Sequence, residues 1–265
     1  GTSRDLLKST KAIQHYFGTN FSWKLMISKN FDLVIKKKIN SFNKAITVDS
    51  DKSISIRSVL IGSISQNISQ VKNILESEDV KSSIECLKKL GVKILKKNKI
   101  YYIHGKGLGS LSTRKNTKLN FGNSGTLARL LIGILSTTPN INVTLTGDHS
   151  LKKRNMKKLI MLMSQFGATF YPKKKFYFPL KLISSKMPIG INYNAGVSAQ
   201  LKSAVLFAGL NSFGKTKIYE KEVSRDHTEK MLSVNQSLLS IKKKPNKTIQ
   251  INGKKTIKAL KIKVS

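Results

Sequence analysis

The sequence predicts an α/β (α+β) protein whose main domain contains three strand–helix repeats. Three observations predict this class. An apolar helical segment that opens with small hydroxyl or amide residues recurs roughly every 70 residues, at 51–65, 122–136 and 196–210. Amphipathic helices that end in glycine, within residues 79–94 and 155–170, follow the first two of these segments. Short β-rich stretches such as NVTLTG and KTKIYE separate the helices.

Each repeat is expected to run strand, helix, strand, helix and then a pair of strands, a βαβαββ unit. The segments DKSISIRSVLIGSIS, GNSGTLARLLIGILS and GVSAQLKSAVLFAGL place Ser53, Ser124 and Ser198 at matching positions. Gly62 and Gly133 follow their serines at equal distances. The alternative is that these three helical segments resemble one another by chance. Three such units, over residues 45–239, predict one domain in which helices pack beneath sheets.

The organisation along the chain is predicted in three parts. Residues 1–44 are expected to be an N-terminal segment, partly extraneous to the protein, that also holds a first strand. Residues 45–241 are expected to form the domain of three repeats. Residues 242–265 are strand-like and lysine-rich, as in KTIQING and KALKIKV. We expect them to begin a second, truncated domain.

The high positive charge suggests nucleic acid as a partner, but the even spread of that charge weakens this interpretation. The chain has 265 residues, with 49 Lys and Arg against 13 Asp and Glu and a net charge of +36. The lysines are spread along the whole chain, and Ile and Asn are abundant too, which indicates a general compositional drift. Cys86 is the only cysteine, so a reducing compartment is expected, and the longest apolar run is too short for a membrane helix. A cytoplasmic protein without a nucleic-acid or membrane partner is predicted.

The turns before the three apolar helices have the properties of an anion site. A helix N-terminus leaves backbone N–H groups unpaired and carries partial positive charge, and serine or threonine hydroxyls add donors. A cation follows in each segment: Arg57, Arg129 and Lys202. N-capping alone would explain a single such turn. Three such turns at matching positions, each followed by a cation, favour a shared anionic ligand.

Five motifs in this order resemble the 5-enolpyruvylshikimate-3-phosphate synthase family: DKSISIRS, FGNSGTLARLLIG, LTGDHSLKKRNMKKL, AGVSAQLKSAVLFAGL and VSRDHTEKML. The resemblance runs from about Ala45 to the last residue. It implies half of a pair of inside-out α/β barrel domains. It also implies transfer of the enolpyruvyl group of phosphoenolpyruvate to the 5-hydroxyl of shikimate 3-phosphate, with release of phosphate, by an enzyme that is monomeric when complete and needs no cofactor or metal. The chain itself is expected to be an inactive fragment, or one domain of a split enzyme.

The resemblance also implies site residues. Lys52 would lie between the two substrates, and Arg154 would pair with phosphoenolpyruvate; these two are the expected catalytic residues. The turn of Asn123, Gly125 and Thr126 would hold the phosphate of phosphoenolpyruvate. The shikimate 3-phosphate site would be lined by Ser53, Arg57, Ser198, Ala199, Gln200 and Ser224, with Arg225 adjacent.

Some positions depart from the family pattern. Ile56 stands where the family usually has His, Asp49-Ser50 where it has Pro-Gly, and Asn155 where it has Pro. Two alternatives stay open. One is an enzyme like UDP-N-acetylglucosamine enolpyruvyl transferase, whose Lys-Asn turn is Lys52-Ser53 here, and the other is a basic RNA-associated module.

Overall fold

The structure, a computed structural model, describes residues 48–265 with two gaps at 235–236 and 244–245. The described residues belong to one compact unit, Val48–Ser265. The N-terminal segment predicted for residues 1–44, with its first strand, lies outside the described residues.

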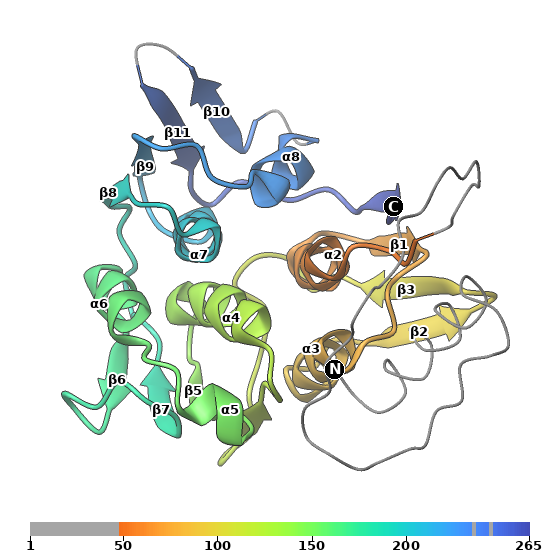
Figure 1. Ribbon diagram of the computed structural model, residues 1–265, viewed down its shortest axis with the longest axis horizontal. Helices are drawn as coiled ribbons and strands as arrows, with labels where there is room; N and C mark the ends of the chain where they lie inside the picture. Colours follow the sequence, from red (N-terminus) through yellow and green to blue (C-terminus); the bar gives the residue numbers. More distant parts are fainter. Residues whose placement is uncertain (1–47, 235–236, 244–245) are drawn as a thin grey trace, which may run out of the picture. The chain divides into compact units, whose positions relative to one another are not determined.

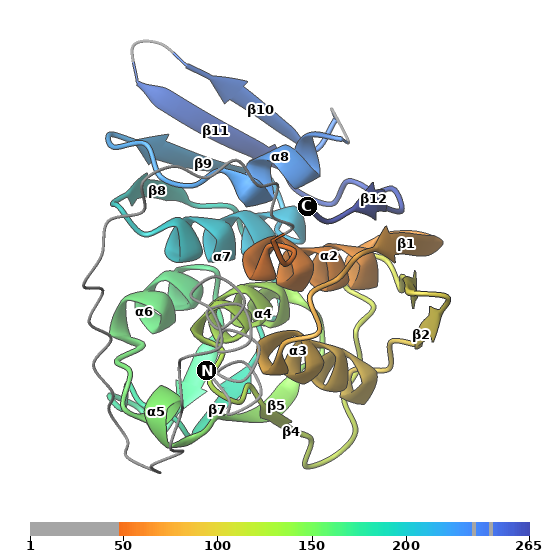
Figure 2. The ribbon, with the colours of Figure 1, turned by 45° about the vertical axis from the view of Figure 1, so that its right-hand side comes forward.

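Three buried helices form the centre of this unit: α2 (Lys52–Ile64), α4 (Gly125–Thr137) and α7 (Ala199–Leu210). They are the three apolar segments that recur in the sequence. Figures 1 and 2 show them side by side, with one sheet outward of each. Other helices and a sheet surround each of these three helices. Nearly all residues of each helix are therefore apolar or small, and not only those on one face.

The three sheets share one topology. In the second and third sheets, the strand before the central helix pairs in parallel with the strand after it. In the first sheet, β12 from the C-terminal end takes that place and pairs in parallel with β1. An antiparallel hairpin completes each sheet. The first sheet has the order β12 (Lys261–Lys263), β1 (Ile68–Lys72), β3 (Ile100–His104), β2 (Ile94–Lys97). The second has β4 (Lys118–Asn120), β5 (Asn142–Thr146), β7 (Leu180–Ile183), β6 (Thr169–Tyr171). The third has β8 (Asn192–Ala195), β9 (Lys215–Glu220), β11 (Lys247–Asn252), β10 (Leu239–Lys242). The second and third repeats confirm the predicted βαβαββ order, and the first repeat shows the same order from its central helix onward.

The C-terminal residues differ from the sequence prediction. We expected residues 242–265 to begin another domain, but β10 spans that boundary, and β11 pairs with β9 inside the third sheet. Strand β12 then pairs in parallel with β1, and the backbone N–H of Asp51 donates to the carbonyl oxygen of Ser265 at 3.0 Å. The open edge of β1 needs a hydrogen-bonding partner, and the end of the described chain supplies it. The last residues therefore complete the first repeat.

The second helix of each repeat lies beside the central three. These helices are α3 (Glu78–Lys89), α5 (His149–Lys152) with α6 (Lys157–Gln165), and α8 (His227–Ser233). Acidic residues in the first turn of α3 and lysines in its last turn match the helix dipole. Helix α8 contacts both α2 and β10, so residues after 226 lie next to α2, the first helix of the unit.

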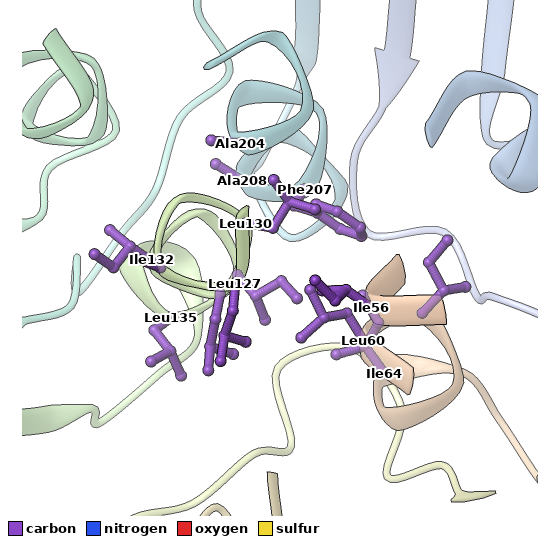
Figure 3. Packing of buried hydrophobic residues seen from close by; sticks show 14 of the residues in the cluster. Ile56, Leu60, Ile64, Leu127, Leu130, Ile132, Leu135, Ala204, Phe207 and Ala208 are labelled. Atoms are coloured by element: carbon purple, nitrogen blue, oxygen red, sulfur yellow. The ribbon is translucent and has the colours of Figure 1, made fainter. Parts of the chain in front are cut away.

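The core lies between α2, α4 and α7 (Figure 3). Ile56 and Leu60 of α2, Leu130 of α4 and Phe207 of α7 are all at most 1% exposed. Gly133 allows α4 and α7 to approach closely, because a Cβ there would stand 2.5 Å from the carbonyl oxygen of Ala204. The close packing holds the N-termini of the central helices in fixed relative positions.

Candidate anion-binding site

A cavity of about 220 Å³ lies where the N-termini of α2, α4 and α7 meet. It is lined by Ser53, Arg57, Thr126, Val197, Ser198, Ala199, Gln200, Ser224, Arg225 and His227. Of these described lining residues, none is Asp or Glu. The structure therefore brings together eight of the residues predicted from the sequence, on three central helices and the loop before α8.

Side-chain caps fix the three helix starts. The carboxylate of Asp51 accepts from the backbone N–H of Ile54 at 2.6 Å. The hydroxyls of Ser124 and Ser198 accept from Leu127 and Leu201 at 3.2 and 3.3 Å. Ser53 is thus not the structural equivalent of the other two serines, because an aspartate caps α2 and Ser53 lies inside its first turn. The remaining first-turn N–H groups of these helices are available to an anion.

Arg57 is 4% exposed and is held by three hydrogen bonds. Its guanidinium donates to the hydroxyl of Thr228 at 2.7 Å, the carbonyl of Ser53 at 3.0 Å and the hydroxyl of Ser203 at 3.2 Å. Burial, and to a smaller extent the nearby charge of Arg225, lowers the pKa of Arg57. An arginine nevertheless keeps its charge, so Arg57 is a fixed cation at the cavity wall.

Two further arginines flank Gly125 at the start of α4. Nη1 of Arg129 donates to the carbonyl of Gly125 at 2.9 Å, and Nη2 of Arg154 donates to Oδ1 of Asn123 at 2.8 Å. A Cβ on Gly125 would stand 2.7 Å from Nη1 of each arginine. Burial and then the charge of Arg154 lower the pKa of Arg129. No carboxylate in the described part of the chain pairs with either arginine, so their charges can act on an anion.

Lys52 lies apart from the cavity. Its Nζ pairs with Oδ2 of Asp79, at the N-terminus of α3, at 3.2 Å, and its side chain is 52% exposed. The structure therefore does not bring Lys52 together with the residues that line the cavity, and its role between two substrates stays a prediction.

Lys202 corrects an expectation from the sequence. The pattern placed it behind the third turn as a cation for the ligand, by analogy with Arg57 and Arg129. Its side chain is fully buried, with Nζ 2.7 Å from Glu220 and 2.6 Å from Glu229. That expectation is wrong, because two carboxylates already neutralise this ammonium group.

Two departures from the family pattern have structural explanations. Ile56 is completely buried and packs in the core between the central helices, so an apolar residue suits the position. Asn155 accepts from the backbone N–H of Lys157 through Oδ1 at 2.7 Å, at the start of α6. Neither residue lines the cavity.

Sequence reasoning missed several residues near the site. Val197 and His227 line the cavity, Thr228 binds Arg57, and Glu220 binds Ser224. His227 and Thr228 lie within the motif VSRDHTEKML, and a signal for Glu220 was its position as the one acidic residue in KTKIYE. Its link to the cavity depends on packing between distant segments, which the sequence does not display.

A larger cavity of about 750 Å³ lies near the opposite ends of the central helices. Gln66, Pro139 and Asn211, which follow α2, α4 and α7, contribute to its lining along with Lys106 and Lys254. Helix C-termini carry partial negative charge, which opposes an anion. Of the two cavities, the smaller therefore fits an anionic ligand better.

The fold is that of the enolpyruvyl transferases. The enolpyruvyl transferase NikO of Streptomyces tendae superposes with a TM-score of 0.62, covering 84% of this chain and 52% of its own. At 13% identity this likeness concerns the fold alone.

Matches with higher sequence identity show the family of the chain. The family model of EPSP synthase (3-phosphoshikimate 1-carboxyvinyltransferase) matches residues 36–265, so the chain belongs to this family. The 3-phosphoshikimate 1-carboxyvinyltransferase of Alkaliphilus oremlandii is 42% identical over 88% of this chain and 53% of its own length. That of Streptococcus agalactiae serotype Ia is 40% identical over 85% of this chain and 52% of its own. The EPSP synthase structure from Acinetobacter baumannii has a TM-score of 0.74 and 36% identity, covering 83% of this chain and 49% of its own.

The chain thus spans about half the length of the curated relatives that it matches. Within the part that the structure describes, no helix is long and apolar enough to cross a membrane.

Proposed function

We propose that this chain supplies the shikimate 3-phosphate site of an enzyme that transfers the enolpyruvyl group of phosphoenolpyruvate to the 5-hydroxyl of shikimate 3-phosphate. One observation carries the proposal. The cavity at the three helix N-termini gathers Ser53, Arg57, Ser198, Gln200 and Ser224 and contains no carboxylate among its described lining residues. Donors and cations without a competing acid suit a ligand that carries a phosphate and a carboxylate.

The second substrate has a matching place beside this cavity. Gly125 lies between the guanidinium groups of Arg129 and Arg154, and Thr126 connects that turn to the cavity. We assign the phosphate of phosphoenolpyruvate to this turn. Arg154 and Asn123 hold each other by a hydrogen bond, so the fork of Arg154 is oriented before the ligand arrives.

The chemistry then depends on holding two anions side by side. The methylene carbon of phosphoenolpyruvate takes up a proton while the 5-hydroxyl loses its proton and bonds to the adjacent carbon. Phosphate then leaves as a proton is lost from the new methyl group, which restores the carbon–carbon double bond of the transferred group. The fixed cations Arg57, Arg129 and Arg154 offset the repulsion between the substrates. Lys52 is 52% exposed and directly precedes Ser53, and we assign it to contact both substrates. The complete transfer is assigned to the whole enzyme, not to this chain alone. Cytoplasmic location and a monomeric complete enzyme stay predictions.

Calorimetry on the chain tests the proposal. We expect shikimate 3-phosphate to bind with weak affinity that falls as salt rises, because the contacts are charged and open to water. Shikimate without the phosphate should bind at least about tenfold more weakly, since charge-assisted hydrogen bonds contribute roughly 1.5–3 kcal/mol each. Ser198→Ala should weaken binding, whereas Ser110→Ala, in the lining of the larger cavity, should not. Equal binding of shikimate and its phosphate would contradict the assignment, and salt-sensitive retention of RNA with no response to either would favour the basic RNA-associated module.

A further inference from the structure

A buried cluster of charges lies behind the cavity wall. Nζ of Lys202 is 2.7 Å from Glu220 and 2.6 Å from Glu229, and these three side chains are at most 1% exposed. Lys247 of β11 adds a second cation, 2.8 Å from Oε2 of Glu220. Burial alone would raise the pKa of Glu220, but hydrogen bonds from Lys202, Lys247 and Ser224 outweigh it and lower the pKa to about 2. Glu220 is therefore a carboxylate at neutral pH.

This cluster is connected to the cavity through Ser224. A single oxygen, Oε1 of Glu220, accepts from the backbone N–H of Ser224 at 3.0 Å and from its hydroxyl at 2.8 Å. Nζ of Lys202 donates to the carbonyl of Ser224 at 3.5 Å, the weakest of these contacts. The backbone and the side chain of Ser224 are thus both anchored, in a loop that has no helix or strand hydrogen bonds of its own.

The neighbouring residues of that loop form one wall of the cavity. Ser224, Arg225 and His227 all line it, and α8 begins at His227. A loop anchored by hydrogen bonds to one buried carboxylate presents these groups in one geometry. Burying an ion pair is costly compared with packing apolar side chains of the same size, so stability alone is a weak explanation for the cluster.

We propose that Glu220, held by Lys202, is a positioning residue for the ligand site: it anchors Ser224 and so fixes the wall formed by Ser224, Arg225 and His227. The proposal rests on the proposed function, because it names shikimate 3-phosphate as the ligand whose binding depends on this wall. Glu220 touches no ligand in this account, and its effect passes through Ser224.

Glu229 provides a matched control. It is buried, it pairs with the same lysine at 2.6 Å, and its carboxylate makes no hydrogen bond to Ser224 in the described part of the chain. Removing either carboxylate leaves one more positive charge near the cavity, which by itself strengthens anion binding. Loss of positioning weakens binding instead. The two effects therefore differ in sign.

The experiment uses the chain with Glu220→Met, Glu220→Gln and Glu229→Met, each checked for folding by circular dichroism. Hydrogen exchange of the Ser224 amide is measured without ligand, and shikimate 3-phosphate affinity is measured by calorimetry. We expect Glu220→Met to remove protection at Ser224 and to weaken binding about tenfold or more. Glu220→Gln should restore part of both, because its amide oxygen can accept from Ser224. Glu229→Met should leave protection in place and affinity unchanged or higher.

Unchanged exchange at Ser224 in Glu220→Met, or equal losses of affinity in Glu220→Met and Glu229→Met, would overturn the inference. If Glu220→Met does not fold, the comparison of Glu220→Gln with Glu229→Gln decides in the same way. If the unmodified chain binds no shikimate 3-phosphate, the proposed function fails, while exchange at Ser224 still decides whether Glu220 holds the loop.

Discussion

The side-chain amide of Gln200 donates a hydrogen bond of 3.0 Å to the hydroxyl of Thr126, across the N-termini of α7 and α4. Both residues line the 220 Å³ cavity. In the proposed assignment Gln200 faces shikimate 3-phosphate and Thr126 belongs to the turn for phosphoenolpyruvate. This bond therefore connects the two substrate positions.

Gln200→Ala should weaken shikimate 3-phosphate binding to the chain by roughly tenfold, because it removes a ligand contact and leaves Thr126 without its partner. Calorimetry measures the change. Gln66→Ala serves as a control, since Gln66 lines the larger cavity near the opposite ends of the central helices. Affinity equal to that of the unmodified chain would remove Gln200 from the site.

Gly125→Ala should raise the KM for phosphoenolpyruvate in the complete enzyme by about tenfold or more while changing the KM for shikimate 3-phosphate little. The added Cβ would stand 2.7 Å from Nη1 of both Arg129 and Arg154, so both guanidinium groups must shift. A misplaced charge contact costs on the order of 1–3 kcal/mol. Steady-state kinetics with each substrate varied tests this prediction, and an unchanged KM for phosphoenolpyruvate would contradict it.

Lys52→Met should lower the activity of the complete enzyme strongly and change its stability little. We expect turnover of the complete enzyme to fall at least ~100-fold, as for loss of a charge contact made in the transition state. Stability should change by less than about 1 kcal/mol, because the Lys52 side chain is half exposed in its pair with Asp79. Phosphate-release kinetics and urea unfolding measure the two quantities. Near-normal turnover would show that Lys52 is only a surface lysine.

The lowered pKa of Glu220 predicts a pH effect on folding. A carboxyl whose pKa falls on folding, here from 4.5 to about 2, stabilises the folded chain fully above pH 4.5. That stability is lost as the pH falls from 4.5 through about 2. Urea unfolding of the unmodified chain should therefore show a steeper loss over this window than Glu220→Gln. Identical slopes would mean that Glu220 is not a charged partner of Lys202 in the folded chain.

Much of this account could be predicted from the sequence, because repeated helices carry strong local signals. The segments containing Ser53, Ser124 and Ser198 are α2, α4 and α7, and the β-rich stretches NVTLTG and KTKIYE are β5 and β9. The pairing of β12 with β1 was not predicted, since it joins segments at opposite ends of the described chain.

The motifs predicted which residues gather at one place, but not the contacts of each. Ser198, Gln200 and Ser224 line one cavity, and their binding of a ligand stays a prediction. Lys202 could not be distinguished from a ligand-binding cation, because its role depends on two glutamates that lie 18 or more residues further along the chain. In a chain where lysine is common everywhere, only burial separates a structural ammonium group from an exposed one.

A crystal structure of the chain with shikimate 3-phosphate would locate the ligand. We predict that the ligand occupies the cavity lined by Ser53, Arg57, Ser198 and Gln200, with its phosphate at the N-terminus of α7. Arg57 should keep its hydrogen bond to Thr228 in that complex. Ligand bound instead in the larger cavity beside Lys106 and Lys254, or a fully occupied ligand away from the three helix N-termini, would contradict it.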